Sequence, residues 1–263
     1  SPTLTQNIDI PENNFLSGVT KLEVDAFLSC DGYNDENCDD YDRTARLFVC
    51  ETDGSSCSEI VRWITPFDRQ PWWRTDITSF ISLLRPGGEK MFKFQISGWP
   101  NNIVQITLRF FQEGTPDNSP HEIYNLWSGD QFNENYNDNF EPLVFEVPEN
   151  AQKVEFVSYI TGHGFACNTG NCAEFCNQSH MYEINGGVGE FSQAFPEAGA
   201  TTYCMEPDRI EAGVIPNQWG TWGYGRSGWC PGLDVDPFVQ EITELVEFGE
   251  ENIINYEACW IPY

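Results

Sequence analysis

Basic residues are scarce in this chain. Only 13 Lys and Arg face 41 Asp and Glu, which gives a formal net charge of −28. This excess of negative charge repels polyanions, so we expect neither a nucleic acid nor an anionic membrane as a partner. The chain also lacks a run of about 18 apolar residues, so no segment is expected to span a bilayer. It begins with Ser1 and shows no leader pattern, which indicates a processed, mature form.

A second absence concerns cysteine spacing. None of the ten cysteines forms the paired Cys-x-x-Cys pattern of a zinc ribbon. An even number of cysteines without that pattern is typical of an exported protein with disulfides. We therefore expect five disulfides and a secreted or periplasmic location. Reduced thiols or metal ligands in the cytosol are the less favoured alternative.

A third absence is that of long helical patterns. Alternating apolar and polar residues, punctuated by turn residues, indicate β-strands instead. The one helix candidate is residues 76–84, and residues 117–139 are polar and read as a connector. We expect two antiparallel jelly-roll sandwiches, residues 1–116 and 140–263. The candidate strands are residues 21–30, 44–52, 58–67, 90–99, 103–113, 142–148, 153–162, 179–187, 202–213 and 237–248.

The pattern of a cysteine, any residue, an acidic residue and an aromatic residue occurs twice, in "CDDY" and in "CAEF". Each copy lies between two candidate strands. A Cys30–Cys38 bridge would close the first corner, and a Cys172–Cys176 bridge would close the second. A five-residue loop such as Cys172–Cys176 gains only about 2 kcal/mol of stability from chain entropy. We therefore expect this bridge to fix the local shape of the turn. It would position Glu174, although spacing alone favours a tight turn with solvated acids.

Five segments together resemble the peptide-N-glycosidase F family. They are, in order, "CDDYDRTARLFV", "RWITPF", "ITGHGFA", "NCAEFCNQSHMYEIN" and "GRSGWCPG". The resemblance implies an all-β fold of two consecutive antiparallel eight-stranded jelly rolls packed side by side, with an active site between them. This agrees with the two sandwiches expected from the strand pattern. The family's activity is that of an amidase that removes asparagine-linked glycans.

The resemblance also implies roles for individual residues. Asp42 is expected to take a proton from the attacking water, and Glu174 to orient the sugar or hydrogen-bond the leaving nitrogen. Arg226 would stabilise the charge that develops on the amide oxygen. The residues expected to contact the substrate are Asp39, Tyr41, Arg43, Trp99, Gly162, His163 and Trp229.

Disulfide pairs follow from the same resemblance. It implies Cys30–Cys38, Cys172–Cys176 and Cys204–Cys230, while Cys50–Cys57 and Cys167–Cys259 would be additional. The chain departs from the family at several places. Tyr41 stands where the family has a tryptophan before the aspartate, and Phe175 follows the glutamate. His163 replaces a tryptophan, and Ser97 stands where the family has a third acid.

The expected reaction is hydrolysis of the amide between the first N-acetylglucosamine and asparagine. It would release the glycan as a glycosylamine and leave aspartate in an N-linked glycoprotein or glycopeptide. A positioned water suffices for this attack, so we expect no metal and no organic cofactor, and we expect a monomer. The main alternative is a non-catalytic, secreted glycan-binding protein of the same fold, which would have lost the acids.

A copper monooxygenase with a twin jelly-roll architecture is a further alternative. It would need clustered His and Met ligands, and the chain has only three of each. His180 alternates with Met181 and Tyr182 in a candidate strand. We expect His180 to be a hydrogen-bonded core histidine rather than a metal ligand.

Overall fold

The computed structural model describes residues 3–98, 103–112, 120–130, 132–163, 172–216 and 220–260. Antiparallel strands dominate it, which confirms the all-β prediction. The chain forms two compact units. Unit 1 comprises residues 1–125, 207–222 and 231–234, and unit 2 comprises residues 126–206, 223–230 and 235–263. Division into folding domains at 116 and 140 stays a prediction. None of the helices in the described ranges is long and apolar enough to cross a membrane.

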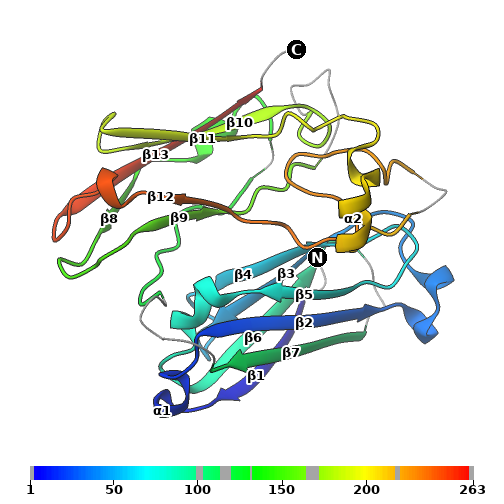
Figure 1. The fold of residues 1–263 in the computed structure, drawn as a ribbon, viewed down its shortest axis with the longest axis horizontal. Helices are drawn as coiled ribbons and strands as arrows, with labels where there is room; N and C mark the ends of the chain where they lie inside the picture. Colours follow the sequence, from blue (N-terminus) through cyan, green and yellow to red (C-terminus); the bar gives the residue numbers. More distant parts are fainter. Residues whose placement is uncertain are drawn as a thin grey trace. The chain divides into compact units, whose positions relative to one another are not determined.

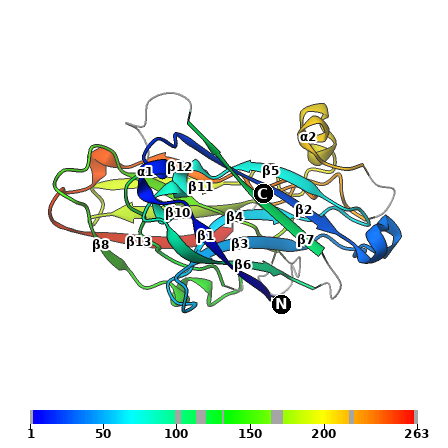
Figure 2. The ribbon, with the colours of Figure 1, turned by 90° about the horizontal axis from the view of Figure 1, so that it is seen from below.

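Unit 1 contains two antiparallel sheets (Figures 1 and 2). The first has the order β1 (Thr3–Ile10), β6 (Gly88–Ile96), β3 (Thr44–Cys50) and β4 (Ser58–Ile64). The second has the order β5 (Trp72–Asp76), β2 (Lys21–Ser29) and β7 (Ile103–Phe111). The short helices of this unit are α1 (Asn13–Leu16), η1 (Asp31–Tyr33), η2 (Asp35–Asn37), η3 (Thr78–Leu83) and α2 (Pro207–Ala212). Helix η3 is the one predicted at 76–84.

The core of unit 1 lies between its two sheets. In β2, every second side chain from Leu22 to Leu28 is buried, as the period of two in the sequence requires. Trp63 of β4 stacks on Trp73 of β5 with ring centroids 5.4 Å apart, so the two sheets meet through large aromatic surfaces. The Trp73 indole donates to the carbonyl of Gly232 at 2.9 Å, which satisfies its only donor.

Unit 2 also consists of antiparallel sheets (Figure 1). One has the order β11 (Gly189–Ala194), β10 (Gln178–Ile184), β13 (Glu251–Trp260) and β8 (Leu143–Glu146), and the other pairs β12 (Phe238–Glu241) with β9 (Glu155–Ser158). Its short helices are η5 (Tyr136–Asn139), η6 (Tyr203–Met205) and η7 (Thr243–Leu245). Within the described ranges, unit 1 has seven strands and unit 2 has six. Eight strands in each jelly roll stay a prediction.

The strand predicted at 202–213 is wrong. This segment forms η6 followed by α2. Pro207 occupies the first position of α2, where its missing N–H costs nothing, and Gly213 follows the last position with a φ of 131°. These two residues favour a helix over the apolar alternation that indicated a strand.

Four disulfides confirm four of the five predicted pairs: Cys30–Cys38, Cys50–Cys57, Cys172–Cys176 and Cys204–Cys230. Cys259 is an exposed thiol that forms no disulfide with any described residue, and the Cys167–Cys259 pair stays a prediction. Ala258 points into the core of unit 2, so the alternation of β13 turns Cys259 to the solvent side. Cys167 lies outside the described residues.

His180 is a buried core residue, which confirms that prediction. Its Nδ1 lies 2.7 Å from the hydroxyl of Tyr256, and that hydroxyl lies 3.0 Å from the hydroxyl of Tyr136. Burial lowers the pKa of His180 from 6.5 to about 4 and raises the pKa values of both tyrosines. The group is therefore neutral at physiological pH.

Acidification is expected to destabilise unit 2 through His180. Between its unfolded pKa of 6.5 and its folded pKa of about 4, only the unfolded state binds the proton. This stability is fully present above the unfolded pKa and is lost progressively, up to about 3 kcal/mol, as pH falls through the window. Urea unfolding across this range should show a flatter pH dependence for His180→Gln than for the wild type. Parallel curves would contradict the assignment.

Candidate functional site

In unit 2, a disulfide-closed corner carries Glu174. The Cys172–Cys176 bridge joins the two ends of a five-residue turn, and Glu174 lies at its middle. The carbonyl of Glu174 accepts the backbone N–H of Ser227 at 3.0 Å, so the corner is tied to the segment that carries Arg226. With both its ends and its centre held, the backbone of Glu174 has little freedom.

Arg226 begins a tight turn that ends at Trp229. The two residues form an isolated antiparallel bridge, and Gly228 between them has a φ of 87°. Arg226 is 1% exposed, and its Nε lies 3.1 Å from Oε1 of Glu174. Its Nη1 donates to the carbonyl of Tyr224 at 2.8 Å. A buried guanidinium needs such compensation, because an unpaired charge away from water is strongly destabilising.

Buried polar side chains fasten the corner to the turn. Gln178 donates to the carbonyl of Ala173 and, at 3.2 Å, to the hydroxyl of Ser227. The Ser227 hydroxyl in turn donates to the carbonyl of Cys176 at 3.0 Å. Gln178 and Ser227 are 1% and 0% exposed, so these bonds form away from water and hold the corner firmly.

Gly162 is required here by space. A Cβ at this position would overlap the carbonyl oxygen of Ala173, so any other residue would push the corner away. The Gly162 carbonyl accepts the indole N–H of Trp229 at 3.0 Å, and its N–H donates to the carbonyl of Ser227 at 3.3 Å. We conclude that Gly162 acts on the site through close backbone packing.

Aromatic rings enclose the guanidinium of Arg226. Its Cζ lies 4.7 Å from the ring centroid of Trp229 and 5.2 Å from that of Phe175. His163 packs against Trp229 in a tilted arrangement, with 4.6 Å between the two ring centroids. Cation–π contacts of this kind are stronger when the cation is desolvated, as Arg226 is.

In unit 1, the loop before β3 carries a second group of predicted residues. Asp39 binds Arg43 with both carboxylate oxygens, at 2.7 Å to Nε and 3.0 Å to Nη2. Oδ1 of Asp39 also accepts the backbone N–H of Tyr41 at 2.9 Å, and the Arg43 guanidinium lies 5.5 Å from the Tyr41 ring centroid. The hydrogen bond to Asp39 raises the pKa of Arg43, and the charge of Asp42 adds to this effect.

Asp42 lies inside this loop, between residues whose backbones are pinned. Arg43 donates its N–H to the Thr65 hydroxyl at 2.8 Å, and Thr44 donates its N–H to the Ser97 hydroxyl at 3.1 Å. Asp42 is half-buried, and its Oδ2 is shielded from solvent. Ser97, in place of the family's acid, thus serves as an acceptor for the backbone next to Asp42.

The predicted residues therefore fall into two groups. Unit 2 brings together Gly162, His163, Glu174, Arg226 and Trp229, and unit 1 brings together Asp39, Tyr41, Asp42 and Arg43. Trp99 lies outside the described residues. Among the residues that the structure describes, His, Cys, Asp and Glu side chains form no group of three with the arrangement of a metal site.

Sequence reasoning missed the supporting residues Gln178, Phe175 and Ser227. Phe175 and Ser227 stand directly beside the predicted Glu174 and Arg226, so their position in the sequence was a usable signal. Gln178 gave no such signal, because a glutamine in a strand pattern usually faces solvent. The structure identifies Gln178 as a supporting residue, because its side chain is only 1% exposed and donates hydrogen bonds to Ala173 and Ser227 of unit 2.

Comparisons with known proteins give concordant results. Residues 131–262, half of the chain, match the family model described as "Peptide-N-glycosidase F, C terminal". Among curated proteins, peptide-N(4)-(N-acetyl-beta-D-glucosaminyl)asparagine amidase F of Elizabethkingia miricola is 28% identical over 218 residues. That alignment covers 76% of this chain and 58% of the relative, so the match spans little more than half of the relative's length.

Solved structures show the same fold. Recombinant peptide:N-glycanase F superposes with a TM-score of 0.73 and 22% identity, covering 100% of this chain and 83% of that one. PNGase F from Flavobacterium meningosepticum, a glycosylasparaginase, gives a TM-score of 0.69 and 20% identity, with coverage of 100% and 83%. From the family match over half of its length, this chain belongs to the peptide-N-glycosidase F family.

Proposed function

We propose that this protein is a peptide:N-glycosidase, an amidase that acts on N-linked glycoproteins or glycopeptides. It hydrolyses the β-amide between the first N-acetylglucosamine and asparagine, which releases the glycan as a glycosylamine and converts asparagine to aspartate. The observation that carries the proposal is the Glu174 carboxylate, held by a disulfide corner against the buried Arg226. A solvent-facing turn with loose acids would not need this construction.

The proposed chemistry divides among three side chains. Asp42 takes a proton from the attacking water, whose oxygen forms the new bond to the amide carbon. Glu174 accepts hydrogen bonds from the sugar or from the leaving nitrogen. The C–N bond then breaks, and the proton held by Asp42 passes to the leaving nitrogen, which stays on the sugar as an amine. The carbonyl carbon remains as the carboxyl group of aspartate.

For Arg226, we propose a positioning role in place of direct contact with the amide oxygen. Its guanidinium is enclosed by Phe175 and Trp229 and is paired with Glu174. A side chain so enclosed acts on the substrate through the carboxylate it holds. The sequence led us to expect oxyanion stabilisation from Arg226, and the burial of this side chain supports the positioning role instead.

We further propose that the protein works as a monomer in an oxidising compartment outside the cytosol. Four disulfides support this location, because such bonds persist where thiols are not kept reduced. The net charge of −28 supports a partner that is not a polyanion.

The amidase is tested with a purified glycopeptide in heavy-oxygen water. We expect intact glycan to be released and the heavy oxygen to appear in a new aspartate, both detected by mass spectrometry. Release that leaves one N-acetylglucosamine on the peptide would instead identify a glycosidase that cleaves between sugars. Glycan binding without any release would support the alternative of a non-catalytic glycan-binding protein.

Asp42→Asn is expected to lower kcat by about 100-fold to 10,000-fold, because the side-chain amide of asparagine cannot take the proton from the attacking water. The fold should be retained, since the two side chains have nearly the same shape. Asp40→Asn is the matched control: Asp40 is an exposed acid two residues away, and its variant should keep full activity. Equal losses in the two variants would contradict a specific role for Asp42.

Glu174→Gln is expected to destabilise unit 2 by about 2–4 kcal/mol, because it leaves the charge of Arg226 buried without its counter-ion. Arg226→Met should cost less, since the thioether packs well between aromatic rings. The double variant should be more stable than the sum of the single effects predicts, by about 1–3 kcal/mol. Urea unfolding of all four proteins measures this coupling.

Glycan release, measured in the same four proteins, separates the effect of the ion pair on stability from the role of Glu174 in the reaction. The double variant should regain stability and still show negligible glycan release, because the carboxylate is absent. Additive stability effects would show that the pair is not coupled. Activity in the double variant would remove Glu174 from the mechanism.

A further inference from the structure

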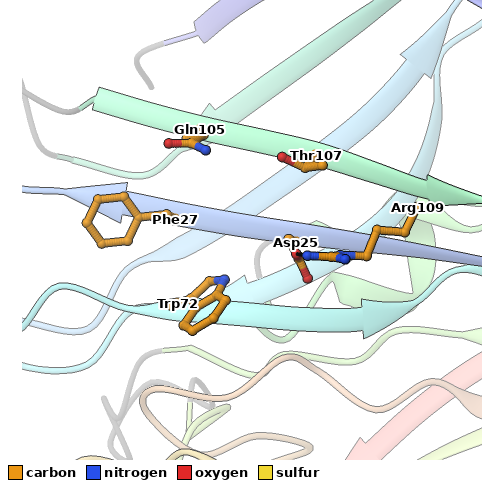
Figure 3. A pocket seen from close by; sticks show the side chains of 6 residues that line it. All are labelled: Asp25, Phe27, Trp72, Gln105, Thr107 and Arg109. Carbon is orange, nitrogen blue, oxygen red and sulfur yellow. Dashed lines mark hydrogen bonds and ion pairs between the residues drawn. The ribbon is translucent and has the colours of Figure 1, made fainter.

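A hollow of about 350 Å³ opens on the outward face of sheet β5-β2-β7 in unit 1 (Figure 3). Its volume lies at the lower end of the range of roughly 300–1,000 Å³ that small-molecule sites occupy. None of the loop residues Asp39, Tyr41, Asp42 and Arg43 lines the hollow, so it is distinct from the loop described above. The residues that line it are Asp25, Phe27, Trp72, Gln105, Thr107 and Arg109.

One end of the hollow is aromatic. Phe27 on the central strand stands opposite both Trp72 on β5 and Gln105 on β7 (Figure 3). Trp72 is 69% exposed, whereas the next residue, Trp73, is 4% exposed and belongs to the core. A large flat ring that faces water on a regular strand offers an apolar surface at little cost in conformational entropy.

The other end is polar and rigid. Asp25 is 8% exposed, and its two oxygens accept Nε of Arg74 at 2.8 Å and Nε of Arg109 at 2.6 Å. Hydrogen bonds from Arg74 and then from Arg109 hold the pKa of Asp25 below its usual range. Each guanidinium has five N–H donors, and both side chains are about half exposed. The buried carboxylate thus fixes two groups of donors at the rim of the hollow.

The charges on this face balance. Nζ of Lys21 lies 2.6 Å from Oε1 of Glu23 and 3.9 Å from Oδ2 of Asp76. Both acids are on the outward side of the same sheet. Three acids therefore face three bases, which leaves no excess of positive charge to attract an anion. The six charged residues on the outward face are Lys21, Glu23, Asp25, Arg74, Asp76 and Arg109.

We propose that this hollow is a saccharide-binding site, distinct from the Asp42 loop of the same unit, that takes a neutral pyranose ring. The apolar C–H face of the sugar stacks on Trp72, and its hydroxyls hydrogen-bond to Gln105, Arg74 and Arg109. A neutral sugar fits because it combines an apolar face with many hydroxyls and carries no charge. Such a site anchors the chain to glycan outside the bond that is cleaved.

The test follows the indole N–H signal of Trp72 by NMR in the full chain, with that signal assigned by its loss in Trp72→Ala. Titration with free oligomannose should shift it in a saturable manner. Gln105→Ala removes a polar partner without touching the Asp25 ion pairs, and it should weaken binding severalfold. Leu4→Ala removes an exposed apolar side chain from β1 of the same unit, and it should leave binding unchanged.

Two results would overturn the proposal. One is an unchanged Trp72 signal at saturating oligomannose. The other is a shift produced by sodium sulfate at lower concentration than by the neutral saccharide, which would identify an anion site. Free oligomannose contains no amide linkage to asparagine, so these outcomes do not depend on amidase activity.

Discussion

The buried charge of Arg226 is the constraint on which the best-defined part of unit 2 depends. A guanidinium that is 1% exposed requires a counter-ion and hydrogen-bond acceptors at fixed positions. Glu174 and the carbonyl of Tyr224 provide them. The Cys172–Cys176 corner, the backbone contact at Gly162 and the turn at Gly228 then hold those acceptors in place. The buried ion pair contributes little net stability, and its main effect is to fix the position of the Glu174 carboxylate.

In unit 1, the loop that carries Asp42 is also held by an ion pair and by hydrogen bonds to its backbone. Asp39 and Arg43 form a bidentate pair around Asp42, and hydroxyls of Thr65 and Ser97 accept the backbone N–H groups on its C-terminal side. Here the ion pair is partly exposed, so its net contribution to stability is small. Its effect is geometric, because two parallel hydrogen bonds define the orientation of both side chains.

Much of this could be predicted from the sequence, for identifiable reasons. The period of two in β2 and the disulfides at 30–38 and 172–176 follow from local pattern and spacing. The expectation that Glu174 and Arg226 belong to one site came from resemblance, because spacing alone favoured a solvated turn. The helix α2 was missed although Pro207 and Gly213 mark its ends, since apolar alternation was given more weight. The close approach of Gly162 to Ala173 and the burial of Gln178 depend on tertiary packing and leave no local signal.

The excess of acidic residues supplies carboxylates that hold several arginine side chains in fixed positions. The chain carries a charge of −28, and five of its arginines form an ion pair with a carboxylate: Arg43, Arg62, Arg74, Arg109 and Arg226. Arg46 shows the opposite case, because burial and the nearby Arg62 lower its pKa. Paired guanidiniums present donors in fixed directions with little net charge, which suits neutral, hydroxyl-rich ligands better than anions. The proposed preference for sugars therefore depends on a few carboxylates that orient a small number of arginines.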